Sequence, residues 1–290
     1  INNKLLQIKS TLVYFTGVFF GENNMINGNP QNNVMKDDFN WEVPVESIPL
    51  PTRGIIYSPD SLLFNTETLQ IKAMTAKEED ILTSQAFIKE NIVVEKLISS
   101  CLIEKSIDVN QMITGDRNAL MVSIRVTGYG ADYNISHSCG SCGHNNNINV
   151  DLSKLAIKRL KTAPIEEGKN IFEYTLPVTK KVVRYKFLTG YDQKEIAITE
   201  KRLKKAGVTY DNTVTSFLEN TILAVDGVTD KNKIKHFVIN MPALDSRSLR
   251  QHIRQSEPGI DMTWNYDCSD CNYSNDITLP ITSEFFWPNT

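Results

Sequence analysis

Four of the five cysteines form two pairs with the spacing CxxC, and this is the clearest chemical signal in the sequence. The pairs are Cys139 with Cys142 and Cys268 with Cys271, while Cys101 stands alone. Zinc prefers four tetrahedral ligands, and two thiolates from one tight turn can fill two of the four positions. The pattern therefore predicts that both pairs share one structural zinc ion.

The separation of the two pairs leaves other interpretations open. Between Cys142 and Cys268 lie 125 residues, far more than in a compact zinc ribbon, so a shared site requires an intervening segment whose ends return to one place. Redox-active or disulfide-bonded pairs, and two separate or vestigial sites, are the alternatives. A disulfide across two residues would close a strained loop, which favours metal binding in a reducing environment. His137 and His144 flank the first pair and are expected to be neighbours of the site, not ligands.

The sequence carries none of the common catalytic signatures. It has no GxSxG elbow, HExxH helix, phosphate-binding loop or dinucleotide-binding glycine motif. The TGYG at 127–130 is interpreted as a helix end, and Glu78, Glu79 and Asp80 as the acidic start of a helix. A closed four-thiolate site has no open position for substrate. We therefore predict a protein that is not an enzyme and binds no small-molecule substrate.

Alternating apolar and polar residues predict strands on both sides of each cysteine pair. The first pair lies between 132–138 and 148–152, and the second between 260–266 and 277–281. Each pair would then occupy the turn of a β-hairpin. Two such hairpins that lean together and share the metal form a zinc ribbon, here split by a long insertion.

Helical patterns account for much of the remaining chain. Thr75 and Glu78 have the spacing of a capping box, and Cys101 lies on an apolar helix face as a small core residue. Helices are predicted over 75–88, 92–104, 116–126, 189–207, 214–225, 230–239 and 245–256, with a strand at 68–74 and a further hairpin formed by 172–176 and 183–187. The predicted fold class is α+β: mixed helices and short antiparallel hairpins, with a split zinc ribbon built from two CxxC hairpins and a helical inserted region.

Four segments are expected along the chain. They are a flexible leader or arm at 1–40, an N-terminal α+β region with the first zinc knuckle at 41–152, an inserted, mostly helical basic region at 153–259, and the second zinc knuckle with an aromatic tail at 260–290. The first 24 residues contain an apolar run at 12–20. Translated upstream sequence or an unstructured leader, an interface arm and a signal peptide are the three interpretations of that stretch.

Composition and charge exclude some functional classes. The 290 residues are 41% hydrophobic, which suffices for one large domain or two modest ones. A net charge of −3 argues against a dedicated DNA-binding domain, and no apolar run reaches the roughly 20 residues of a membrane span. Residues 153–205 contain 14 basic and 6 acidic side chains. This bias is interpreted as a solvated face, or as a docking surface for an acidic neighbour or for transient nucleic-acid contact.

Several motifs, in order along the chain, resemble one family. They are PTRGIIY at 51–57, IKAMTAKEEDILTS at 71–84, LISSCLIEKSIDV at 97–109, TGDRNALMVSIRVTGYGADY at 114–133, CGSCGH at 139–144, LDSRSLRQHI at 244–253, the second CxxC and SEFFWP at 283–288. With these motifs the chain resembles the baseplate hub subunit family of T-even-like tailed bacteriophages. The segments 1–40 and 153–240 carry the least of the resemblance.

The resemblance implies a virion structural or tail assembly protein of the baseplate hub that works through protein–protein contacts. It further implies other phage hub and tail proteins as partners, and a location in the virion tail after assembly in the host cytoplasm. Candidate partner-binding residues are Arg117, Arg125, Lys201, Arg202, Lys204, Lys205, Phe285, Phe286 and Trp287, since arginines and aromatic side chains concentrate at interfaces. For Phe286 and Trp287 the alternative is that they cover the domain's own core.

Two other functions compete with this hypothesis. A zinc-ribbon nucleic-acid-binding module is the main alternative, and the acidic overall charge disfavours it. A dithiol enzyme is the third. Such enzymes place the reactive pair at a helix N-terminus, which lowers the pKa of the nucleophilic thiol, whereas both pairs here are predicted between strands.

Overall fold

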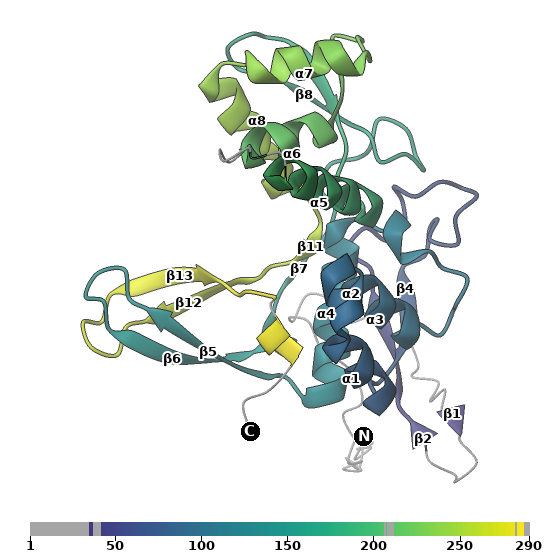
Figure 1. The fold of residues 1–290 in the computed structure, drawn as a ribbon, viewed down its shortest axis with the longest axis vertical. Helices are drawn as coiled ribbons and strands as arrows, with labels where there is room; N and C mark the ends of the chain where they lie inside the picture. Colours follow the sequence, from purple (N-terminus) through teal and green to yellow (C-terminus); the bar gives the residue numbers. More distant parts are fainter. Residues whose placement is uncertain (1–34, 37–41, 206, 208–211, 282, 287–290) are drawn as a thin grey trace, which may run out of the picture.

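The computed structural model describes residues 35–36, 42–205, 207, 212–281 and 283–286. Its helices and short antiparallel hairpins confirm the predicted α+β class. Most of the predicted leader at 1–40 lies outside the described residues, which include from it only β1 (Met35–Lys36), paired with β2 (Glu42–Val43). Three parts can be followed in Figure 1: a body, a helical lobe beside it, and an arm of two long hairpins that projects from the body.

The body combines a two-stranded sheet with four helices. Its elements are β3 (Val45–Pro49), β4 (Thr68–Lys72), α1 (Ala76–Thr83), α2 (Gln85–Glu90), α3 (Val93–Cys101), the 3-10 turn η1 (Val109–Gln111) and α4 (Thr114–Tyr129). The predicted capping box is present, since the amide of Thr75 donates to the Glu78 carboxylate over 2.9 Å. The predicted helix over 75–88 is two helices, because Ser84 leaves helical geometry and its hydroxyl accepts the amide of Phe87 to start α2.

The core of the body lies between the β3–β4 hairpin, α3 and α4. Ile71, Leu97, Cys101, Leu120 and Ile124 are fully buried there, which confirms Cys101 as a small core residue. Each buried leucine or isoleucine contributes about 1.5–3 kcal/mol by removal from water. Apolar burial therefore stabilises this part of the chain.

The helical lobe contains a small sheet that the sequence pattern only partly predicted. Its elements are β8 (Phe172–Thr175), β9 (Val182–Tyr185), α5 (Gly190–Lys205), α6 (Thr213–Thr221), β10 (Ile222–Val225), α7 (Lys231–Ile239) and α8 (Ala243–Ser256), with strand order β10–β9–β8. The predicted helix over 214–225 was wrong in its last turn. Ile222–Val225 is a strand because its backbone pairs with β9, which overrides the helical spacing of its apolar residues.

Body and lobe meet where β7 (Ile157–Lys158) pairs with β11 (Gly259–Ile260). Gly115, in the first turn of α4, packs against this junction so closely that an added Cβ would lie 1.8 Å from the carbonyl oxygen of Pro258. No other residue fits at that position without a backbone shift. Two segments that flank the helical lobe in sequence thus pair at one crowded crossing.

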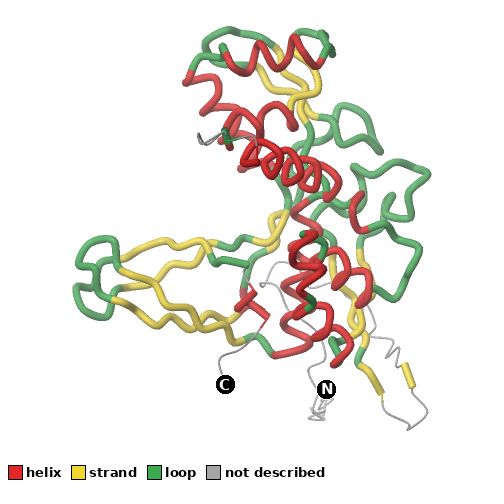
Figure 2. The backbone as a smooth tube through the Cα atoms, viewed as in Figure 1, coloured by secondary structure: helices red, strands yellow, loops and turns green. Residues whose placement is uncertain are grey.

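The arm consists of two antiparallel hairpins that lie side by side (Figure 2). Their strands are β5 (Asp132–Ser138), β6 (Asn145–Asp151), β12 (Thr263–Asp267) and β13 (Ser274–Thr278). Short 3-10 turns follow, η2 (Leu152–Lys154) after β6 and η3 (Ser283–Phe286) near the end of the chain. The helical lobe is inserted in the sequence between the two hairpins, as the split-ribbon prediction requires.

Candidate metal centre

The two CxxC turns are equivalent in structure as well as in sequence. In the first hairpin Ser138 pairs with Asn145, and in the second Asp267 pairs with Ser274, so each turn begins and ends at the same register. A constant offset of 129 positions, from 139 to 268, relates the two hairpins. Two copies of one local design therefore meet at the tip of the arm.

All four cysteine sulfurs of the two turns converge. Cys139 Sγ lies 3.8 Å from Cys271 Sγ, and Cys142 Sγ lies 3.7 Å from Cys268 Sγ. The four sulfur atoms all lie within 4.8 Å of one another. A tetrahedron with metal–sulfur bonds of about 2.3 Å has edges of about 3.8 Å, so these distances fit a four-thiolate metal site. The prediction that the distant pairs meet in one cluster is confirmed.

Backbone hydrogen bonds hold the two turns in the same conformation. The amide of Cys139 donates to His144 O and the amide of Cys268 donates to Tyr273 O, over 2.8 and 3.0 Å. The residue after the second cysteine has a left-handed backbone in each turn, with φ of 75° at Gly143 and 54° at Asn272. Glycine and asparagine are the residues that best tolerate that conformation, which explains why the turns differ in sequence but agree in shape.

Two asparagines connect the turns to each other, and the sequence analysis missed them. Asn146 Nδ2 donates to Cys268 Sγ over 3.6 Å, and Asn275 Nδ2 donates to Cys139 Sγ over 3.8 Å. Each asparagine stands seven positions after the first cysteine of its own turn and contacts a sulfur of the opposite turn. An alignment of the two knuckles against each other would have revealed this shared asparagine.

The two asparagines differ in how firmly they are held. Asn146 is buried, and its Oδ1 also accepts the amide and the hydroxyl of Ser269 over 2.9 and 3.0 Å. The amide of Asn275 also donates to Tyr273 O of its own turn, over 3.5 Å. Asn146 is therefore the stronger link between the turns.

Backbone amides also prepare particular thiols for metal binding. Amide donation from Cys271 and Asp270 lowers the pKa of Cys268 to about 6. Amides of Cys142 and Ser141 lower the pKa of Cys139 in the same way. Because a thiolate is the form that binds metal, the lowered pKa values of Cys139 and Cys268 favour both residues as ligands.

The second cysteine of the first turn behaves differently. The amide of His144 favours the thiolate of Cys142, but burial and the three neighbouring thiols outweigh it and raise the pKa of Cys142 to about 12. Four thiolates this close cannot all be charged without a cation among them. The donor set thus fits a divalent metal ion that prefers sulfur.

The two predicted histidine neighbours do not contribute to the sulfur cluster. His137 packs edge-to-face on Tyr266, with ring centroids 5.8 Å apart. His137 and Tyr266 occupy equivalent positions, each two residues before the first cysteine of its turn. The contact supports the approach of the hairpins beside the metal centre.

Arg125 fixes the root of the arm. It is fully buried, and its guanidinium donates to Phe285 O at 2.7 Å, Gly130 O at 2.5 Å and Asp132 O at 2.9 Å. These carbonyls belong to the C-terminal segment, the end of α4 and the start of β5. One side chain therefore ties both ends of the arm to the body.

Several predicted partner-binding residues have internal roles in place of the exposed surface expected for them. Phe285 and Phe286 are buried, and the Phe285 ring packs edge-to-face on Tyr133 at 5.2 Å. Arg117 is 8% exposed and donates to Gln193 on α5 over 2.6 Å, so it links body and helical lobe. Arginine and aromatic side chains suit buried anchors as well as interfaces, and the sequence pattern does not distinguish the two. For Phe286 the structure agrees with the alternative of covering the core.

The other predicted partner-binding residues remain on the surface or lie outside the described part. Lys201, Arg202 and Lys205 are exposed on α5, and Lys201 donates to Lys89 O over 3.0 Å. The side chain of Lys204 and the whole of Trp287 are not among the described residues. The α5 cations thus keep the exposure that a docking surface needs.

Two buried carboxylates of the body, Asp116 and Glu78, have structural partners. Asp116 accepts the Thr52 amide at 3.1 Å and the hydroxyls of Thr52 and Tyr57, both at 2.6 Å. Glu78 is buried, which raises its pKa, but hydrogen bonds from Lys72, Ser100 and Thr75 prevail and lower it to about 2. Both groups join segments distant in sequence and leave no free oxygen facing a cleft. They stabilise the body and offer no acid–base pair.

The fold and the sulfur cluster define an α+β protein whose two CxxC hairpins form a four-cysteine ribbon split by an inserted lobe. A family model described as "T4 bacteriophage base plate protein" matches residues 56–287. The chain belongs to this family of phage baseplate proteins. Curated protein sequences and solved structures give no significant match.

Family membership has direct consequences for role and location. It gives the chain a structural role in a phage baseplate, with a place in the virion tail and contacts to other phage proteins. Membership in a baseplate family favours a structural role over a catalytic one. Within the described residues, no helix has the length and apolar character needed to cross a membrane.

Proposed function

We propose that this protein is a structural or assembly subunit of the baseplate hub, stabilised by one zinc ion bound to Cys139, Cys142, Cys268 and Cys271. The observation that carries the proposal is the convergence of four sulfurs from turns 129 positions apart, within a chain of the baseplate family. The ordered sequence motifs that resemble hub subunits support the hub in particular. The α5 cations Lys201, Arg202 and Lys205 belong to the surface proposed for contact with hub proteins.

Zinc is proposed as the metal because of the donor set and its geometry. Four thiolates at tetrahedral spacing favour zinc over magnesium or calcium, which prefer oxygen ligands. Bound zinc would supply charge neutralisation and a rigid link between four sulfurs, with no open position for a substrate. Asn146 and Asn275 would position the cysteines, which would then join the tips of the two hairpins around one ion.

The proposed role of the metal is to complete the fold of the arm. Binding energies of about 10–16 kcal/mol in isolated zinc fingers exceed the stability of many whole domains. In this chain the helical lobe separates the two ligand pairs in sequence. The metal would therefore join the two hairpins on either side of the lobe. The arm would then be a rigid projection available for contact with neighbouring baseplate proteins.

A combined metal and assembly experiment tests this function. Protein purified without chelators should contain one zinc ion per chain by elemental analysis, and hub complexes from infected cells should contain the chain by mass spectrometry. Absence of metal would overturn the zinc proposal alone. Absence of the chain from hub intermediates and virions, with metal present, would overturn the hub proposal alone.

A further inference from the structure

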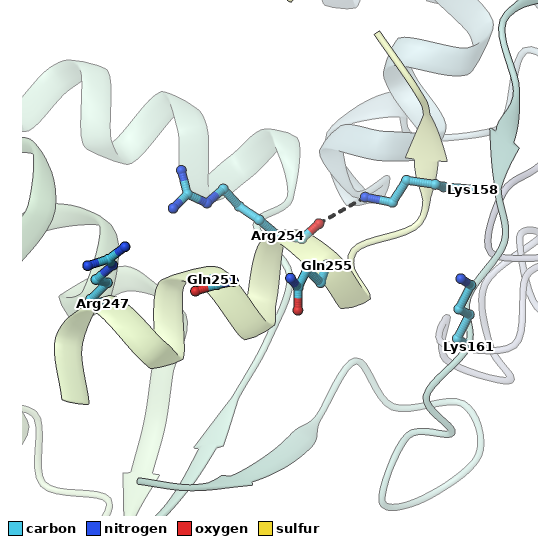
Figure 3. Close-up of a pocket in the computed structure, with 6 residues that line it drawn as sticks. All are labelled: Lys158, Lys161, Arg247, Gln251, Arg254 and Gln255. Carbon is cyan, nitrogen blue, oxygen red and sulfur yellow. Dashed lines mark hydrogen bonds between the residues drawn. The ribbon is translucent and has the colours of Figure 1, made fainter. Parts of the chain in front are cut away.

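A basic cleft lies beside the crossing between body and helical lobe. Its volume is about 810 Å³, and its lining consists of Lys158, Lys161, Arg247, Gln251, Arg254 and Gln255. Figure 3 shows four of these side chains along α8 and the two lysines on the neighbouring chain segment. The lining includes four cations, two amides and no carboxylate.

Helix α8 presents its cleft residues along one face. Arg247, Gln251, Arg254 and Gln255 follow each other at spacings of four, three and one residues. Arg247 and Arg254 are two turns apart, or about 10 Å along the helix axis. Lys158 Nζ donates to the carbonyl of Arg254 over 2.9 Å, which holds this lysine against the last turn of α8 (Figure 3).

Carboxylates near the cleft are engaged elsewhere. Within the described part of the chain, none of the ion pairs includes a cation of the cleft. Asp245, at the start of α8, accepts the amides of Val178 and Thr179 over 2.7 and 3.0 Å. Glu257 interacts with Lys158 but lines a separate pocket. The cleft therefore concentrates positive charge that no ion pair among the described residues neutralises.

We propose that this cleft binds an acidic segment of another baseplate protein, with two carboxylates about 10 Å apart that pair with Arg247 and Arg254. Arginine forms two parallel hydrogen bonds with a carboxylate, and charge complementarity selects an acidic partner. Gln251, between the two arginines, can bond to the partner's backbone. The identity of the partner as a baseplate protein rests on the proposed function.

Other ligand classes fit the cleft less well. Small-molecule pockets are lined mainly by apolar and aromatic side chains, and this lining has neither. Single-stranded nucleic acid needs aromatic platforms for base stacking, which are also missing from the lining. The chain has a net charge of −3, which opposes the approach of a long polyanion. An acidic protein segment remains the best match.

Charge reversal in the full-length protein tests the cleft. The double variant Arg247→Glu/Arg254→Glu is compared with Lys231→Glu/Lys235→Glu, which reverses two exposed cations on α7 of the same lobe. We expect incorporation into baseplates from infected cells to fall at least tenfold for the first variant and to stay within twofold of wild type for the second. Equal incorporation of both variants, each with unchanged metal content and melting temperature, would overturn the proposal.

Zero-length carbodiimide cross-linking of assembled baseplates identifies the partner group. This reagent joins a lysine to a contacting carboxylate, and Lys161 and Lys158 lie in the cleft. We expect cross-links from these lysines to aspartate or glutamate of a second protein, and none from Lys231 or Lys235. Cross-links only at other lysines would refute binding of an acidic segment at the cleft, but would leave the proposed baseplate function intact. A wild-type chain absent from hub intermediates as well as from baseplates would refute both the cleft and the baseplate function. Stronger retention of the chain by 20-base-pair DNA than by baseplate proteins, lost in the Arg247→Glu/Arg254→Glu variant, would show a nucleic-acid site instead.

Discussion

The arm and the body are stabilised in different ways. Ten of the sixteen residues of α4 are buried in the body, whereas one of the seven residues of β5 is buried in the arm. An isolated two-stranded hairpin is marginally stable in water, and the two arm hairpins share only a narrow apolar seam that includes Ile148, Tyr266 and Ile277. Apolar burial can therefore define the body, but the tip of the arm depends on its sulfur cluster.

Two kinds of cysteine illustrate the difference. In the body, desolvation raises the pKa of Cys101 to about 12, so this side chain remains a neutral thiol. In the arm, amide donors lower the pKa of Cys268 to about 6. One residue type thus serves as core packing in one region and belongs to a sulfur cluster that fits a metal in the other, and the local surroundings determine which.

The largest effect should come from removing one ligand of the arm. Cys271→Ser leaves three thiolates, so we expect loss of bound zinc and a destabilisation of several kcal/mol that unfolds the arm. Cys101→Ser, which places a hydroxyl in the body core, should cost about 1–3 kcal/mol and keep the metal. Elemental analysis and thermal melts of both variants measure the contrast. Equal melting temperatures would show that the second knuckle does not stabilise the protein.

A pH-dependent effect should arise at the junction of body and helical lobe. Burial raises the pKa of Glu257 from 4.5 to about 7. A raised pKa means that this carboxyl stabilises the fold below pH 4.5, and that the contribution is lost as the pH rises through 7. This shift in pKa corresponds to a loss of about 3 kcal/mol in the free energy of unfolding. Glu257→Gln, which stays neutral, should therefore be more stable than wild type at pH 8 and similar to it below pH 4.5.

Denaturant unfolding of the two proteins at pH 4.5 and pH 8 measures this difference. Glu195→Gln, at an exposed position of α5, is the matched control and should follow the wild-type curve. The four clustered cysteines are the same in all three proteins, so their contribution to the pH dependence of unfolding cancels when the proteins are compared. A Glu257→Gln variant that keeps the wild-type pH dependence would contradict the assignment to this carboxyl.

Much of the architecture could be predicted from local patterns. Alternation around each CxxC pair gave the two hairpins, and the spacing of Thr75 and Glu78 gave the start of α1 with its capping box. These features depend on neighbours in sequence. The meeting of the four sulfurs also followed from chemistry, because neither pair alone completes the coordination that zinc prefers.

Features that depend on contacts between distant segments could not be predicted. The apolar residues of Ile222–Val225 continue a helical spacing, and only the pairing of this segment with β9 identifies it as a strand. Arg125 looks like an interface residue in sequence, yet it is buried because three carbonyls from separate segments surround it. The basic cleft combines α8 with 158 and 161, so a count of charges along 153–205 captured only half of it.

A smaller effect should distinguish the two knuckles. Each asparagine donates to a sulfur of the opposite turn and to a carbonyl of its own turn, and Asn146 in addition accepts the amide and hydroxyl of Ser269. Asn146→Ala therefore removes more of the link between the turns than Asn275→Ala. Loss of groups that orient metal ligands costs about 10–100-fold in metal affinity. We expect Asn146→Ala to lower the metal affinity by about 100-fold and Asn275→Ala by about 10-fold. Competition with a zinc chelator measures both, and equal affinities would refute the difference between the knuckles.

The smallest predicted effect concerns the aromatic contact across the arm. His137 and Tyr266 pack edge-to-face at 5.8 Å from equivalent positions of the two hairpins, just behind the sulfur cluster. Such pairs contribute about 0.5–1.5 kcal/mol beyond their burial. Single substitutions would also change packing, so His137→Ala, Tyr266→Leu and the double variant should be compared in a double-mutant cycle. We expect a coupling energy of about 0.5–1 kcal/mol in unfolding of the metal-bound protein. A coupling near zero would mean that this ring contact does not help to hold the hairpins together, which would strengthen the contrast between the arm with its sulfur cluster and the apolar body.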